Sequence, residues 1–185
     1  MLSLLTIFVS AFVVGLSDAM APGPVLTVTI SETLKRGFKA GPLIVLGHAI
    51  LEIFLLTLIA VGLGPFFQHP LVTLIFLSAG GVVLLWMGIQ MIRTNKQITK
   101  EALSATGTES PYGPIWAGIV LSVSNPFWII WWVTFGMGFV TQSLQYGLIG
   151  LICFYCGHIL SDLAWFSFVS FSVSAGRRLC PPMVY

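Results

Sequence analysis

The chain has 185 residues, of which 57% are hydrophobic and 8% are charged, and its formal net charge at pH 7 is +2. Soluble domains carry about 25% charged residues, so a globular fold of this composition could not cover its surface with polar groups. The composition predicts an integral membrane protein and excludes a soluble domain. The small net charge gives no reason to expect a nucleic-acid partner.

The first apolar segment, Leu2–Ile30, contains the sequence SDAMAPGPV at residues 17–25, which has two interpretations. Its Ala-Met-Ala resembles the cleavage site of a signal peptide, but no Lys or Arg occurs before Lys35 to form the positive region of such a peptide. Apolar residues also continue directly after Pro24. We therefore expect a membrane-spanning segment whose helix is broken at the Pro-Gly-Pro sequence.

Four further apolar segments are long enough to cross a bilayer as a helix, which takes about 20 residues. In chain order they are Pro42–Phe67, Leu71–Ile92, Pro114–Val140 and Leu144–Ala175. The sequence therefore predicts an all-α integral membrane protein with five transmembrane helices in a single membrane domain, residues 1–185.

Basic residues occur only after the first, third and fifth of these segments, so all of them would lie on one side of the membrane. They are Lys35, Arg36, Lys39, Arg93, Lys96, Lys100, Arg177 and Arg178. The positive-inside rule assigns that side to the cytoplasm. We expect the N-terminus outside and the C-terminus in the cytoplasm.

Two sequence features occur twice, in the same order. A proline follows a residue suited to capping a helix at Gly23-Pro24 and again at Asn125-Pro126. Each is followed by a Gly-His pair with an acid four residues after the His, at residues 47–52 and 157–162. Residues at that spacing share one face of a helix.

If the repeat unit has three spans, its second copy must be inverted in the membrane, because an odd number of spans ends on the opposite side from where it began. We expect repeat one at residues 1–92, a cytoplasmic connector at 93–113 and repeat two at 114–185, which lacks a counterpart of Leu71–Ile92 and therefore its sixth helix. Inverted repeats with broken helices at matching positions are typical of secondary transporters, whose substrates bind near the midplane.

The two helix breaks are the predicted substrate site. Half-helices that begin at Pro24 and Pro126 would present free N–H groups and a partial positive charge to an anionic group. The alternative is a plain proline kink in each packed span. The predicted substrate-binding residues are Pro22, Gly23, Pro24, Asn125 and Pro126.

Glu52 and Asp162 lie well inside predicted spans, where a carboxylate costs on the order of 2.5–3.5 kcal/mol or more. Each acid must be neutralised, paired or in contact with water, and its partner is His48, His158 or a bound cation. We expect these four residues to couple transport to protons or ions, with purely structural His–acid pairs as the alternative. Asp18 either belongs to the same cavity or lies near the membrane surface.

Two other features are assigned no ligand. The aromatic residues at 127–132 either line a cavity or face lipid, and Trp at the membrane interface is the commoner case. Cys153 and Cys156 have the CxxC spacing but lack the neighbouring ligands of a haem or zinc site, so we expect them to pack. We expect no enzyme chemistry, no cofactor and no resident metal.

The sequence resembles the lysine exporter / threonine-homoserine resistance family of bacterial amino-acid translocators. The resemblance rests on Ala21-Pro22-Gly23-Pro24, on Gly37 and Gly41, and on Asn125-Pro126, and it extends from residue 1 to about residue 178. It implies an inner-membrane exporter of amino acids, driven by the proton or ion gradient. It does not define which amino acid is carried.

Family members typically have six spans, one more than this sequence predicts. The chain is then either a truncated product, which would be an inactive remnant, or a subunit whose neighbour closes the bundle as a homo-oligomer. A divalent metal-ion exporter that uses the two His and two acids is the alternative function, because imidazole and carboxylate suit such ions. A thiol–disulfide carrier is set aside because no Cys occurs in residues 1–152.

Overall fold

The computed structural model describes residues 3–21, 23–63 and 113–179, together with 69–72 and scattered positions between 74 and 89. Pro22 lies outside the described residues, as do most of the predicted span Leu71–Ile92 and nearly all of the connector 93–113. Within the described residues every regular element is a helix and there is no strand.

The first predicted segment is two helices. Helix α1 (Leu4–Ala19) begins after Ser3, whose Oγ accepts the Thr6 N–H at 3.2 Å. Helix α2 (Pro24–Arg36) begins at the proline and ends where Gly37 adopts a φ of 78°, a left-handed conformation that glycine tolerates. The two helices are bent by 76°, so the break predicted at the Pro-Gly-Pro sequence is present.

The remaining described helices follow three of the other apolar segments. Helix α3 (Ala40–Leu58) continues into the π-helical segment η1 (Ile59–Leu63). After α7 (Gly113–Val123), a second break precedes α8 (Pro126–Trp131), the π-helical η2 (Trp132–Gly136) and α9 (Met137–Leu144). Helix α10 (Gly147–Leu179) is the longest, at 33 residues.

Three of the described helices are long and apolar enough to cross a membrane. They are Ala40–Gly62, Pro126–Leu144 and Gly147–Arg177, and the bent pair of α1 and α2 is a fourth if it is counted as one span. The fold is therefore that of a helical membrane protein, with three or four spans among the described residues.

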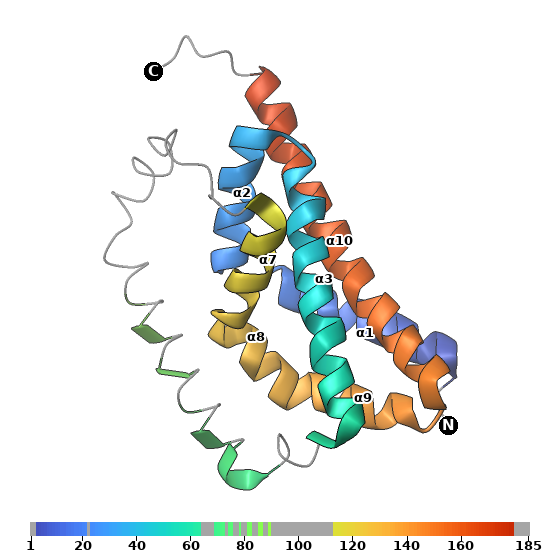
Figure 1. Ribbon diagram of the computed structural model, residues 1–185. Coiled ribbons are helices and arrows are strands. Elements are labelled where there is room, and N and C mark those ends of the chain that lie inside the picture. The colour runs from blue at the N-terminus through green and yellow to red at the C-terminus, as the bar shows by residue number, and fades with distance from the viewer. Residues whose placement is uncertain are drawn as a thin grey trace.

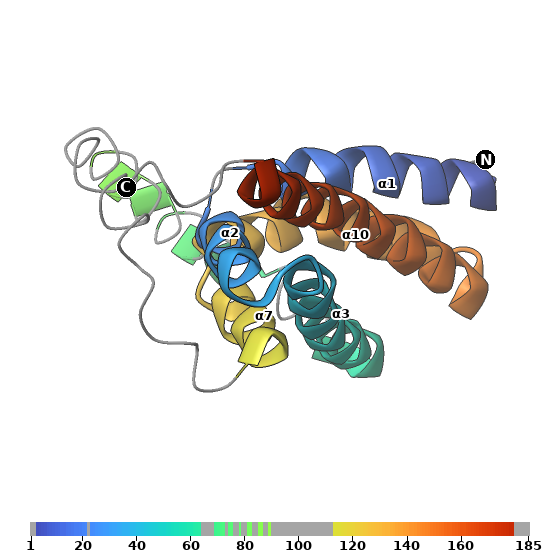
Figure 2. The same ribbon diagram turned by 90° about the horizontal axis from the view of Figure 1, so that it is seen from above.

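Helix α10 is the centre of the arrangement. It lies between α1 on one side and α3 on the other, α2 packs against both α10 and α3, and α7 packs against α3 (Figures 1 and 2). Hydrogen bonds also connect α10 to its neighbours: Tyr155 Oη donates to the Ala49 carbonyl at 3.0 Å, and the Thr33 and Ser170 hydroxyls are 2.9 Å apart. Near the end of α10, Arg177 donates to the Leu34 carbonyl.

The glycine of each Gly-His pair lets another helix approach closely. Gly47 of α3 lies against the backbone carbonyl of Ile115 in α7, and a Cβ at Gly47 would overlap that oxygen. Gly157 of α10 meets the carbonyl of Phe8 in α1 in the same way. Small residues at such contacts are typical of helix packing in membranes.

Polarity in this bundle is reversed relative to a soluble protein. Leu5, Val61 and Leu148 are 70%, 77% and 72% exposed, whereas the carboxyl-bearing Glu52 and Asp162 and the imidazole of His158 are buried. Because lipid solvates an apolar surface, this distribution fits a bilayer and not water.

The buried polar residues lie between two apolar clusters. One cluster contains Ile7, Trp131 and Phe154, and the other contains Ala19, Val45 and Phe166. Along α10 the order is Phe154, His158, Asp162 and Phe166, so the polar side chains lie between the clusters and are shielded on both sides.

Candidate functional site

The two helix breaks lie close together in space. A Cβ built on Gly23, which precedes α2, would be 4.0 Å from Asn125 Nδ2, which precedes α8. The two starts are not equivalent, because Asn125 Oδ1 accepts the Phe127 N–H at 3.1 Å, whereas Gly23 has no side chain to cap α2. The N–H groups at the start of α2 therefore lack the side-chain acceptor that α8 has.

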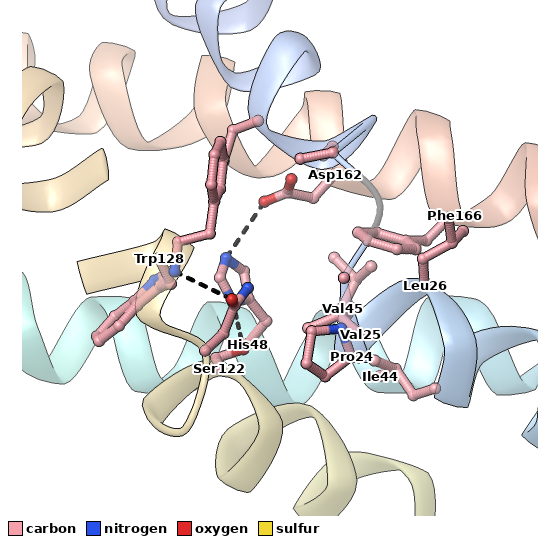
Figure 3. A pocket seen from close by; sticks show the side chains of 16 residues that line it. Pro24, Val25, Leu26, Ile44, Val45, His48, Ser122, Trp128, Asp162 and Phe166 are labelled. Atoms are coloured by element: carbon pink, nitrogen blue, oxygen red, sulfur yellow. Dashed lines mark hydrogen bonds and ion pairs between the residues drawn. The ribbon is translucent and has the colours of Figure 1, made fainter. Parts of the chain in front are cut away.

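A pocket opens at this meeting point. Its polar lining comes from Asp18, His48, Ser122, Asn125 and Asp162. His48 and Asp162 point toward one another across it, while the start of α2 and the ring of Phe166 form the opposite wall (Figure 3). The apolar part of the lining is Val25, Leu26, Ile44, Val45, Phe127, Trp128 and Phe166.

Two His and two acids, one pair each from α3 and α10, form a compact cluster beside the pocket. His48 Nε2 is 3.2 Å from Glu52 Oε1 and 3.3 Å from Asp162 Oδ2. His158 Nε2 is 3.2 Å from Glu52 Oε1 and 3.9 Å from Asp162 Oδ2. Each acid therefore contacts the His of its own helix and that of the other helix.

Glu52 is the most enclosed member of the cluster and does not line the pocket. Its Oε1 accepts the indole N–H of Trp132 at 2.9 Å and that of Trp128 at 3.1 Å, in addition to its contacts with both imidazoles. Four nitrogens around one oxygen compensate the loss of hydration that burial of a carboxylate imposes.

The two imidazoles are positioned by different contacts. His48 Nδ1 is 2.7 Å from Ser122 Oγ, and that hydroxyl donates to the Gly118 carbonyl at 2.7 Å. Because the Ser122 proton is already used, its oxygen accepts from His48 Nδ1–H, and His48 Nε2 is left to face the two acids. His158 instead stacks on Trp131, with ring centroids 4.3 Å apart.

The predicted site residues that the structure describes do gather in one region. Gly23, Pro24 and Asn125 line the pocket with His48, Asp162 and Asp18, while Pro126 begins α8 beside it. Glu52 and His158 lie behind the pocket, in contact with His48 and Asp162. Asp18 also lines the pocket.

Sequence reasoning missed four residues of this region: Ser122, Trp128, Trp131 and Trp132. The Trp residues had been given no role, yet two donate to Glu52 and one stacks on His158. Ser122 carries no motif, although it lies three residues before the helix break. No resident metal was expected, but His48, His158 and Asp162 offer ligand atoms that all lie within 4.8 Å of one another.

Comparison with known proteins gives one family and several relatives. The family model of the LysE type translocators matches residues 16–180. The putative amino acid efflux protein YcgF of Bacillus subtilis is 27% identical over 176 residues, 95% of this chain and 84% of the relative.

Two further relatives have similar identity. The chemotactic transduction protein ChpE of Pseudomonas aeruginosa is 27% identical over 169 residues, 88% of this chain and 79% of the relative. The leucine efflux protein of Salmonella typhimurium is 26% identical over 159 residues, 85% of this chain and 73% of the relative. No solved structure matches the chain. Because the family model covers most of the sequence, the chain belongs to the LysE type translocator family, whose members are transporters and not enzymes.

Proposed function

We propose that the chain exports amino acids across the bacterial inner membrane as a secondary transporter driven by a gradient of protons or another ion. Its family and the names of two relatives, an amino acid efflux protein and a leucine efflux protein, support amino-acid export. The observation that carries the proposal is the pocket at which an uncapped helix start faces a buried carboxylate. An amino acid is a zwitterion and needs both kinds of partner.

In this proposal the carboxylate of the amino acid binds at the start of α2. Helix N-termini bind anions through free N–H groups and a partial positive charge. The uncapped start at Gly23 and Pro24 is more available than that of α8, whose first N–H after the proline is bonded to Asn125. Asn125 and Pro126 are proposed to shape the other side of the same subsite, and Pro22, outside the described residues, stays a predicted binding residue.

The ammonium group of the substrate is proposed to face Asp162 and Asp18, the two acids that line the pocket. Asp162 Oδ2 is buried and makes no hydrogen bond among the described residues, with only its ion-pair contacts to the two imidazoles, so a bound ammonium group would supply one. The side chain of the substrate then faces the apolar wall formed with Val45 and Phe166.

Coupling to the gradient is assigned to the cluster of His48, Glu52, His158 and Asp162. Ionisable groups inside a membrane mark ion pathways by default. His48 and Asp162 belong both to this cluster and to the pocket, so an ion that binds in the cluster changes the charge that the amino acid meets. This shared membership supports coupling at one site.

The topology is part of the same proposal. Five spans, with inverted repeats at residues 1–92 and 114–185 and a cytoplasmic connector at 93–113, would place the N-terminus outside and the C-terminus in the cytoplasm. The two proline breaks that meet at the pocket support the repeat. We also propose that copies associate in the membrane, which crosslinking of the expressed chain would test.

A divalent metal ion is the rival cargo, and the cluster of His and acids is the observation in its favour. Two relatives are named for amino-acid efflux, and the pocket suits a zwitterion with an apolar side chain. We therefore propose the amino acid as cargo.

The test is amino-acid efflux from dipeptide-loaded bacteria that express the chain, beside an empty vector and Asp162→Asn. We expect faster efflux of one or a few amino acids, with at least a tenfold loss in Asp162→Asn, because this change removes the more buried of the two carboxylates that face the ammonium group. His69→Ala is the matched control, since His69 is exposed.

Two results would contradict the proposal. Efflux equal to that of the empty vector, with the protein confirmed in the membrane, would exclude amino-acid export by this chain. Normal efflux by Asp162→Asn would exclude the assigned role of that carboxylate.

A further inference from the structure

We propose that His48, His158, Asp162 and Glu52 form a binding site for a divalent transition-metal ion of the zinc class, and that an ion bound there blocks export. The binding itself is independent of the proposed function, whereas the block of export rests on it.

His48, His158 and Asp162 offer ligand atoms that all lie within 4.8 Å of one another, and Glu52 Oε1 lies 3.2 Å from both imidazoles as a fourth candidate ligand. Zinc binds nitrogen and carboxylate oxygen at about 2.0–2.2 Å, which places ligands of one tetrahedron about 3.3–3.6 Å apart. Three distances in the cluster agree: His48 Nε2 to Glu52 Oε1 and His158 Nε2 to the same oxygen, 3.2 Å each, and His48 Nε2 to Asp162 Oδ2, 3.3 Å. The fourth, His158 Nε2 to Asp162 Oδ2, is 3.9 Å and requires a shift of a few tenths of an ångström.

The atoms left without partners support a ligand here. Glu52 Oε2 and Asp162 Oδ2 are buried and have no hydrogen-bond partner among the described residues. Buried carboxylate oxygens without partners are costly, and a cation in the cluster would satisfy them. Glu52 Oε1 already accepts two indole N–H groups, so this acid binds the ion either through Oε1 or through the free Oε2 after a small rotation.

The kind of ion follows from the ligands. Two imidazole nitrogens with two carboxylates suit zinc and its neighbours, whereas Mg²⁺ and Ca²⁺ prefer all-oxygen sites. A metal-bound His commonly bonds through its other ring nitrogen, which sets the tautomer. Ser122 provides that contact for His48 at 2.7 Å, so Nε2 is the nitrogen that faces the acids.

An ion can reach the site through the pocket, and once bound it would restrict the movement of the helices. His48 and Asp162 line the pocket, so an ion in the pocket reaches two ligands directly. Its ligands come from α3 and α10, and four bonds would hold these helices together. Because transport requires the helices around the site to rearrange, we expect a bound ion to stop export.

The experiment is calorimetric titration of the purified chain in lipid nanodiscs with zinc chloride. We expect one ion to bind per chain. The dissociation constant should be at least tenfold higher in Asp162→Asn and in His158→Gln. Ser122→Ala should weaken binding roughly 10-fold, as the loss of contacts behind a ligand usually does. His69→Ala, which removes the exposed histidine, should bind as the unmodified chain does.

A second measurement uses the unmodified chain, so its result does not depend on whether a variant folds. Cobalt(II) added to the unmodified chain should give the intense visible absorption of a tetrahedral ion, which zinc then abolishes. The weak spectrum of a six-coordinate ion, or binding that His69→Ala removes, would overturn the site.

Efflux assayed with and without zinc separates the two proposals. Amino-acid efflux that zinc inhibits and a chelator restores, equally in the unmodified chain and in His69→Ala, supports both proposals when zinc binding depends on the cluster. Cluster-dependent binding without any amino-acid efflux retains the metal site and overturns the transport function. Amino-acid efflux without zinc binding overturns the metal site alone. Transport of zinc itself into loaded vesicles overturns the proposal that a bound ion blocks export.

Discussion

The two Gly-His motifs have the same spacing and opposite orientations toward the pocket. In α3 the His lines the pocket and the acid is buried behind it: the side chains of His48 and Glu52 are 12% and 0% exposed. In α10 the acid lines the pocket and the His is enclosed by aromatic rings. The pocket therefore receives one member of each pair, His48 and Asp162, and the interior receives the other two, Glu52 and His158.

The pocket and the interior each receive one His and one acid from different helices, an arrangement that we call the crossed pairing. It shows that two copies of a sequence motif need not have equal roles. The interior pair is surrounded by partners, because Glu52 accepts two indole N–H groups and His158 stacks on Trp131 and Phe154. Asp162 Oδ2 makes no hydrogen bond among the described residues, and the same is true of Glu52 Oε2 and His158 Nδ1 in the interior, but only the pocket pair borders space that a cargo can occupy. We infer that the pocket pair contacts the cargo, whereas the interior pair supports the fold in addition to its proposed part in coupling.

The largest expected effect is a difference in stability between variants of the two acids, Glu52 and Asp162. Glu52→Gln removes the carboxylate that both imidazoles and both indoles contact, so we expect a loss of stability of about 3 kcal/mol together with export. Asp162→Asn should lose export with much less change in stability. Thermal unfolding in nanodiscs beside the efflux assay measures both, and equal destabilisation by the two variants would contradict the comparison.

The next effect concerns the helix contact that brings the motifs together. Gly47→Ala places a methyl group against the Ile115 carbonyl, so α7 must move away from α3, at a cost of about 2 kcal/mol. Movement of α7 also draws Ser122 away from His48, and export should fall with stability. Gly138→Ala is the matched control, because a Cβ there meets nothing within 4 Å, and it should leave the melting temperature unchanged.

A smaller effect tests the partners of the interior acid. Trp132→Phe retains an aromatic ring but removes the indole N–H that donates to Glu52 at 2.9 Å. We expect the free energy of unfolding to fall by about 1 kcal/mol. Trp128→Phe removes the longer bond, 3.1 Å, from a less buried ring and should cost less. Chemical or thermal unfolding ranks the two, and a reversed order would show that ring packing dominates.

The smallest effect should come from the support of the pocket pair. Ser122→Ala removes the acceptor of His48 Nδ1–H, and bonds of this kind in membranes are worth roughly 0.6 kcal/mol on average. We expect a few-fold lower efflux with nearly unchanged stability. Ser122→Thr retains the hydroxyl and should restore efflux, and failure to do so would indicate a packing role instead.

The sequence predicted the helix starts at Pro24 and Pro126 because proline at the first helical position is a local signal. It also predicted that the four His and acid residues matter, since ionisable groups inside apolar segments need an explanation. It did not predict the crossed pairing, which depends on how α3 and α10 pack against each other. The roles of Trp128, Trp131 and Trp132 were missed for the same reason, as interfacial Trp residues have the same local pattern.

The π-helical turn at Trp132–Gly136 explains how neighbouring Trp residues both reach the interior. Such a turn holds one residue more than an α-turn, and it begins directly after Trp131, which stacks on His158, with Trp132, which donates to Glu52. In evolutionary terms it behaves as a single-residue insertion that the helix absorbs without breaking. A relative with a plain α-helix here would need a one-residue gap in its alignment, because without that gap every later position is displaced by about 100° around the helix axis.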